Sequence, residues 1–121
     1  MGSQRAERVG EEIKDVVSGT IRRLKDSRIT GMVSVTDVEV SGDLRHAKVF
    51  VSIYGDEPTQ HQTMEGLQSA VGFMRSEVGK ALKLRVVPEL HLHQDRSLER
   101  GAAIHDLLAR IKREEQEGHA E

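Results

Sequence analysis

The sequence contains no cysteine and no tryptophan, and its only aromatic residues are Phe50, Tyr54 and Phe73. Without cysteine there can be no disulfide framework, no thiolate nucleophile and no cysteine-bound zinc, which is typical of a reducing compartment. No segment approaches the roughly 20 apolar residues that span a bilayer, and the N-terminus lacks the pattern of a secretory signal. We therefore expect a cytoplasmic protein without a membrane segment.

The scarcity of aromatic residues and the absence of catalytic signatures restrict the chemistry available to the chain. Proteins that read RNA by stacking bases on a sheet depend on exposed aromatic rings, so an RRM is disfavoured. The sequence has no Walker loop, no nucleophile elbow and no local Ser/His/Asp signature. We therefore expect a protein that binds a partner without catalysing a reaction and without a cofactor.

Length and charge indicate one domain with an acidic end. The 121 residues are enough for a single core. The formal net charge of −2, from 18 bases and 20 acids, argues against a nucleic-acid partner for the chain as a whole. Four of the acids are Glu114, Glu115, Glu117 and Glu121, so residues 1–113 carry 18 bases and 16 acids, a net charge of +2. We expect a mildly basic single domain over residues 1–113 and an acidic polar tail over residues 114–121.

Hydrophobic periodicity predicts an α+β fold. The expected elements are a helix at 5–25, strands at 32–40 and 46–54, a helical stripe at 64–82, a strand at 89–94 and a C-terminal helix at 97–111. The alternation of the first strand changes phase along its length, which predicts a bulge near Asp37. Within the second helical stripe Gly66, Gly72 and Gly79 each cost about 1 kcal/mol relative to alanine, so we expect a break or a close contact there.

The side of the second long helix that lies opposite its apolar stripe combines small and basic residues. The residues on this face are Gly72, Arg75, Ser76, Gly79, Lys80 and Lys83. A sugar-phosphate backbone can approach a helix closely only where side chains are small, and it needs cations or amide donors at its phosphates. Arg85, just beyond the helix, adds charge at the same end. The face is therefore a candidate RNA-binding surface, and an ordinary solvated helix face is the alternative.

A second group of basic residues lies at the end of the first helix. It consists of Arg22, Arg23, Lys25 and Arg28. Cations at this end of a helix also complement the helix dipole, so the group has a structural interpretation as well as an RNA-binding one.

His91, His93 and Asp95 alternate on one face of the last strand, opposite Leu90 and Leu92. This spacing could present three ligands to a divalent metal, which makes it the best enzyme hypothesis in the sequence. No further ligand is evident nearby, and polar residues also alternate on any solvent-facing strand. We therefore expect no metal site and keep the three residues as an alternative.

Much of the sequence resembles a known family. The resemblance is carried by Val35-Thr36-Asp37-Val38-Glu39-Val40-Ser41-Gly42-Asp43-Leu44, by Ala70-Val71-Gly72-Phe73-Met74-Arg75 and by Val87-Pro88-Glu89-Leu90. These segments are similar to the ribosome-binding factor A family, bacterial factors that assist assembly of the small ribosomal subunit. The similarity extends over residues 5–111.

The resemblance implies a type II KH-like fold. In that fold a kink, here at Ala70-Val71-Gly72, replaces the usual Gly-x-x-Gly loop between two helices. The implied order is helix, strand, strand, helix, kink, helix and strand, followed by a C-terminal helix. Ala70 thereby joins the residues expected to lie against RNA.

By the same resemblance the chain would bind the free 30S subunit and its 16S rRNA near the neck, aid maturation of the 16S rRNA 5′ end and support growth in the cold. Assembly GTPases that act on the same particle are implied as further partners, and we expect a monomer. The acidic tail departs from the family pattern, so no RNA contact is expected there. Two other functions stay open, a metal-dependent hydrolase and a protein adaptor without RNA contact.

Overall fold

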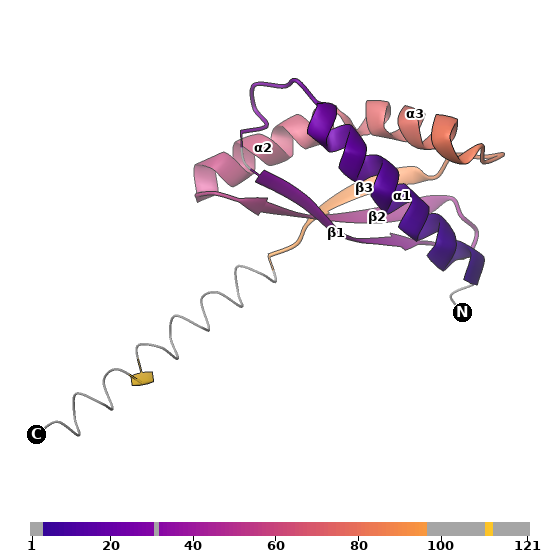
Figure 1. Cartoon of the computed structure of the whole chain (residues 1–121), viewed down its shortest axis with the longest axis horizontal. Helices are drawn as coiled ribbons and strands as arrows, with labels where there is room; N and C mark the ends of the chain where they lie inside the picture. Colours follow the sequence, from indigo (N-terminus) through magenta and orange to yellow (C-terminus); the bar gives the residue numbers. More distant parts are fainter. Residues whose placement is uncertain (1–3, 31, 97–110, 113–121) are drawn as a thin grey trace, which may run out of the picture.

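A computed structural model describes residues 4–30, 32–96 and 111–112 of the chain. Three helices pack on one side of a three-stranded sheet (Figure 1). The elements are α1 (Gln4–Arg23), β1 (Met32–Val40), β2 (His46–Tyr54), α2 (Glu57–Ser69), α3 (Val71–Leu82) and β3 (Glu89–Gln94). This order confirms the predicted α+β fold. Of the predicted C-terminal helix only residues 111–112 are described, and they are helical.

The sheet has the order β1-β2-β3, with β2 in the centre. β1 and β2 form an antiparallel hairpin, whereas β2 and β3 run parallel and are connected through α2 and α3. The register of the hairpin shifts between Val35 and Asp37, which confirms the predicted bulge. Thr36 is the extra residue, and its hydroxyl donates to Asp95 Oδ2 at 2.8 Å and lies 3.3 Å from the Phe50 carbonyl oxygen.

The core lies between the helices and one face of the sheet. Alternate residues of β2 are buried, as period-2 patterning predicts. The core residues are Val9, Ile13, Val17 and Ile21 of α1, Val35 of β1, Ala47, Val49, Val51 and Ile53 of β2, Leu67 of α2, Met74 and Val78 of α3, and Leu90 and Leu92 of β3. Each larger aliphatic side chain contributes about 1.5–3 kcal/mol by leaving water. The intervening strand residues lie on the opposite face, which no described helix covers.

The second long helix is broken at Ala70, where the resemblance implied a kink. α2 ends at Ser69 and α3 begins at Val71, and Ala70 between them has φ −95° and ψ 1°. The Ala70 N–H donates to the Leu67 carbonyl at 3.0 Å, and the Ala70 carbonyl accepts from Met74 N–H at 2.9 Å. One residue therefore provides a backbone hydrogen bond both at the end of α2 and at the start of α3. Beyond the break, Met74 and Val78 of α3 are buried in the core.

Candidate nucleic-acid interface

The exposed side of α3 borders a shallow hollow of about 580 Å³. Its lining consists of Gly72, Arg75, Ser76, Gly79 and Lys80 from α3, together with Val87 from the segment that leads into β3. Five residues of the predicted face thus surround one depression. Val87 was not among the predicted residues, because only the path of the chain after α3 brings it there.

The two glycines of the hollow have different surroundings. A Cβ added at Gly79 would lie 2.9 Å from Val87 Cγ2, so the glycine allows the segment before β3 to pack directly on α3. A Cβ added at Gly72 would meet nothing within 4 Å. Gly72 therefore leaves open space above the first turn of α3, which is what close approach of a ligand backbone requires.

Arg75 is held in place by backbone carbonyls on the other side of the hollow. Its Nη2 donates to the Val87 carbonyl at 2.9 Å and its Nε to the Pro88 carbonyl at 3.3 Å. Guanidinium has five N–H donors, and these two hydrogen bonds use two of them, so the other three can meet an anion. The charge is pre-oriented, because the hydrogen bonds to the carbonyls restrict the side chain before any ligand arrives.

Glu77 links α1 to α3 beside the hollow. Its carboxylate lies 3.7 Å from Arg23 Nη2 and 3.9 Å from Lys80 Nζ. The two cationic side chains are 65% and 73% exposed, and such pairs stabilise a fold by only about 0–1 kcal/mol. Arg23 therefore joins the basic surface of α3, and both cations can exchange this partner for a phosphate.

Lys83 and Arg85 extend the basic surface beyond the end of α3, and both are exposed. Lys83 ends the helix in a left-handed conformation, with φ 52°, and its N–H donates to the Gly79 carbonyl at 3.2 Å. Ala70 differs from the other predicted contacts, because it is half-buried and packs against the core. Its position suits a role in shaping the kink.

The basic residues at the end of α1 do not form one patch. Arg22 borders a small hollow beside Val33 and Val35 of β1. Arg28 instead borders a separate hollow along α2. Lys25 is exposed and borders neither of these two hollows. Of the four predicted residues only Arg23 has a described contact with α3, so the sequence cluster is divided among three parts of the surface.

Arg28 has a local structural role. Its Nη2 and Nε donate to the Asp26 carboxylate at 2.7 and 3.1 Å, and its backbone N–H donates to the same group at 2.9 Å. The side-chain hydrogen bonds from Arg28, followed by the backbone hydrogen bond, lower the pKa of Asp26 from 3.8 to about 2. The ion pair stabilises the loop between α1 and β1.

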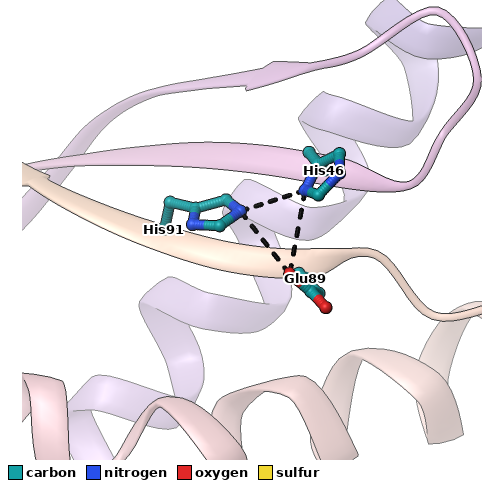
Figure 2. A group of neighbouring side chains, drawn as sticks. All are labelled: His46, Glu89 and His91. Atoms are coloured by element: carbon teal, nitrogen blue, oxygen red, sulfur yellow. Dashed lines mark hydrogen bonds and ion pairs between the residues drawn. The ribbon is translucent and has the colours of Figure 1, made fainter.

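The structure does not assemble His91, His93 and Asp95 into a ligand set. The His93 ring stacks on Phe50, with ring centroids 5.5 Å apart, and Asp95 accepts the hydrogen bond from Thr36. His91 instead faces His46 and Glu89 (Figure 2). Sequence reasoning missed His46 and Glu89, because they become neighbours of His91 only through the pairing of β2 with β3.

Comparison with known proteins places the chain in a family. A family model for ribosome-binding factor A matches residues 5–108. The chain belongs to the ribosome-binding factor A family. Ribosome-binding factor A from Halothermothrix orenii is 52% identical over 122 residues, covering 100% of this chain and 99% of the relative. The family assignment made from the sequence is thereby confirmed.

Solved structures of ribosome-binding factor A share the fold. The solution NMR structure of a candidate ribosome-binding factor A from Thermotoga maritima is 31% identical, with a TM-score of 0.69, and the match covers 80% of this chain and 92% of that chain. A homology model of the Thermus thermophilus factor, fitted into a cryo-EM map of its 30S complex, is 20% identical, with a TM-score of 0.63, and the match covers 75% of this chain and 96% of that chain. Among the described residues, no helix has the length and apolarity to cross a membrane.

Proposed function

We propose that this chain binds the free 30S ribosomal subunit through its 16S rRNA and assists late maturation of the subunit, including processing of the 16S rRNA 5′ end, without catalysing a reaction. The observation that carries the proposal is the hollow on α3, whose lining is small and basic. Family membership supports a ribosomal partner. The Thermus thermophilus coordinates fitted into a 30S complex support the small subunit as that partner.

The hollow can bind an RNA backbone by shape and charge. The open space above Gly72 admits the sugar-phosphate chain, and Arg75, already oriented by two carbonyls, offers N–H donors to a phosphate. Lys80 and Lys83 are exposed cations that release condensed counterions when they neutralise phosphates. These contacts hold rRNA in one conformation, and other factors perform the cleavage. The site of action is the cytoplasm, with assembly GTPases on the same particle as further partners.

The decisive experiment measures binding to purified 30S and 50S subunits on sucrose gradients and across a salt series. The wild-type chain should associate with free 30S subunits alone. Replacing Arg75, Lys80 and Lys83 with Glu should weaken this association severely and flatten its dependence on salt, because fewer counterions are released. Arg75 also bonds the carbonyls before β3, so the double variant Lys80→Glu, Lys83→Glu, which keeps those bonds, is measured beside it.

The matched control is the double variant Arg5→Glu, Arg8→Glu. Both arginines are exposed on the first turns of α1, outside the hollow, and the change in net charge equals that of the Lys80, Lys83 variant. The control should bind 30S subunits nearly as well as wild type. Equal losses in the two double variants would show that net charge alone matters. Unchanged affinity and salt slope in folded Lys80→Glu, Lys83→Glu protein would remove α3 from the interface and favour an adaptor function.

Maturation of the 5′ end is tested in cells that lack this chain. Primer extension on 16S rRNA should show accumulation of the precursor with an unprocessed 5′ end, together with slow growth in the cold. Wild-type chain and the Arg5→Glu, Arg8→Glu control should restore both, whereas the Lys80→Glu, Lys83→Glu variant should not. Restoration by the Lys80→Glu, Lys83→Glu variant would show that maturation of the 5′ end does not require the basic surface of α3.

A further inference from the structure

Two histidines and a glutamate converge on the face of the sheet that the described helices leave uncovered. His46 lies at the start of β2, and Glu89 and His91 lie on β3 (Figure 2). His46 Nδ1 is 3.1 Å from His91 Nε2, and Glu89 Oε2 is 3.8 Å from His46 Nδ1 and 4.0 Å from His91 Nε2. We propose that these three residues form a binding site for a divalent transition-metal ion, with Zn²⁺ as the ion that the donors fit.

The spacing of the three donor atoms matches the bond lengths of zinc. The nearest point equidistant from atoms separated by 3.1, 3.8 and 4.0 Å lies in their plane, roughly 2.1 Å from each of them. Zinc bonds to imidazole nitrogen are about 2.0–2.1 Å long, and those to carboxylate oxygen about 2.0–2.2 Å. Rotation of the three exposed side chains can draw the donors together and bring the ion out of this plane toward the tetrahedral arrangement that zinc prefers, without movement of either strand.

The chemistry of the donors selects among metals. Two imidazoles and one carboxylate suit Zn²⁺, Ni²⁺, Co²⁺ or Cu²⁺, whereas Mg²⁺ and Ca²⁺ prefer oxygen ligands alone. The two ring nitrogens face each other at hydrogen-bonding distance, so one N–H bridges them when no ion is bound. On metal binding this proton is exchanged, through solvent, to the other nitrogen of its ring, and both neutral rings then present a lone pair.

The strands hold the donors in position before an ion arrives. His46 and Glu89 are register partners across the parallel pair β2/β3, and the Glu89 N–H donates to the Arg45 carbonyl at 2.8 Å. The side chains of His46, Glu89 and His91 are 55%, 62% and 45% exposed, so the ion is reached from solvent. Water can complete the coordination on that side, as in zinc sites with three protein ligands and an open position.

The test is titration of Zn²⁺ into the tag-free, full-length, chelator-treated chain by isothermal calorimetry. We expect one Zn²⁺ per chain and no binding of Mg²⁺. His46→Gln and His91→Gln should each weaken Zn²⁺ binding by at least about tenfold, since even the loss of a group that only supports a ligand costs 10–100-fold. Glu89→Gln should weaken binding as well. All three residues are exposed, and circular dichroism checks that the variants are folded.

The chain offers matched controls among its other histidines. His93→Gln changes the same face of β3, and His61→Gln changes a histidine on α2, so both should bind Zn²⁺ as wild type does. The variant His105→Gln, His119→Gln tests the remaining two and should also be unchanged. Co²⁺ gives a second readout, because its visible absorption bands should be present in wild type and absent in His91→Gln.

Several results would overturn the site. These are absence of Zn²⁺ binding up to millimolar concentration, equal affinity in wild type and the double variant His46→Gln, His91→Gln, and loss of binding in the His105, His119 variant. None of these outcomes depends on the 30S subunit, so the metal site and the proposed function are tested separately.

Discussion

Glycines of α2 and α3 that look alike in the sequence have different physical roles. Gly79 lies under Val87, and Gly66 lies under Ile29, whose Cγ1 would be 2.7 Å from an added Cβ. Gly72 has no such neighbour. Close packing of a loop on a helix therefore accounts for two of the three glycines, and open space at the hollow accounts for the third.

Alanine substitutions at Gly79 and Gly72 should have opposite effects on stability. Gly79→Ala forces Val87, which is stiff at χ1, away from α3, and should destabilise the fold by about 1–2 kcal/mol. Gly72→Ala lies in a helix with free space, and should stabilise it by up to about 1 kcal/mol. Urea unfolding of both variants checks the pair. Equal effects would mean that the contact with Val87 does not constrain position 79.

Lys83 combines a strained backbone with a cation on the candidate RNA surface. A left-handed conformation costs an L-residue about 1–2 kcal/mol, and glycine is the residue that most often ends a helix in this way. Lys83→Gly should therefore raise the free energy of unfolding by about 0.5–1 kcal/mol, after the greater entropy of glycine in the unfolded chain is counted. The same variant should bind 30S subunits less tightly. A stabilised variant with unchanged binding would exclude Lys83 from the interface.

At the scale of elements, the loop between α1 and β1 contains an ion pair that is sensitive to acid. The pKa of Asp26 is lowered from 3.8 to about 2 by the hydrogen bonds from Arg28. A carboxyl whose pKa is lower in the folded state adds stability that is complete above the unfolded pKa. That stability is lost as the pH falls through the folded pKa, so the loop should loosen between about pH 4 and pH 2.

Carboxyl carbon NMR of Asp26 across this pH range measures the effect directly. In the wild-type chain the resonance should titrate near pH 2. In Arg28→Ala the side-chain donors are absent, and the titration should move up toward 3.8. A midpoint near 3.8 in the wild-type chain would show that the Arg28 pair does not persist in solution. Such a result would return Arg28 to the set of available cations.

The whole molecule has two faces with different chemistry. The helical side presents the basic hollow of α3, and the uncovered face of the sheet presents His46, Glu89 and His91. Leu90 and Leu92 point into the core between these two faces, so β3 carries core residues on one side and candidate ligands on the other. A variant on either face should leave the other face intact.

Removing residues 114–121 should leave both the fold and 30S binding intact. These residues lie outside the described part of the chain and contribute four acids and no bases. Without them the net charge changes from −2 to +2, which lowers repulsion between the protein and phosphate. Thermal unfolding and subunit binding at moderate salt measure the two properties. Markedly weaker binding of the truncated chain would show that the tail takes part in the interface.

Local patterns were sufficient to predict much of this fold. Period-2 alternation defined the three strands, and helical periodicity defined α1. The change of phase in β1 predicted a bulge near Asp37, and the structure has it at the adjacent Thr36. These signals are local, since each depends on which side of one element faces the core. The kink at Ala70 was different, because the apolar stripe continues through it. The three glycines predicted a break or a close contact somewhere in this stretch, and only the resemblance to ribosome-binding factor A placed the break at Ala70-Val71-Gly72.

The sequence by itself determined the elements, the family and the composition of the α3 face, because these depend on residue types at fixed spacing along one element. Only the tertiary structure decided which side chains meet across elements. It placed Val87 over Gly79, fixed Arg75 on two carbonyls and separated Arg28 from the other cations. It also brought His46 to Glu89 and His91, residues more than 40 positions apart. The contact of His46 with Glu89 and His91 follows from the register of β2 with β3. The whole core determines that register, and no local pattern contains it.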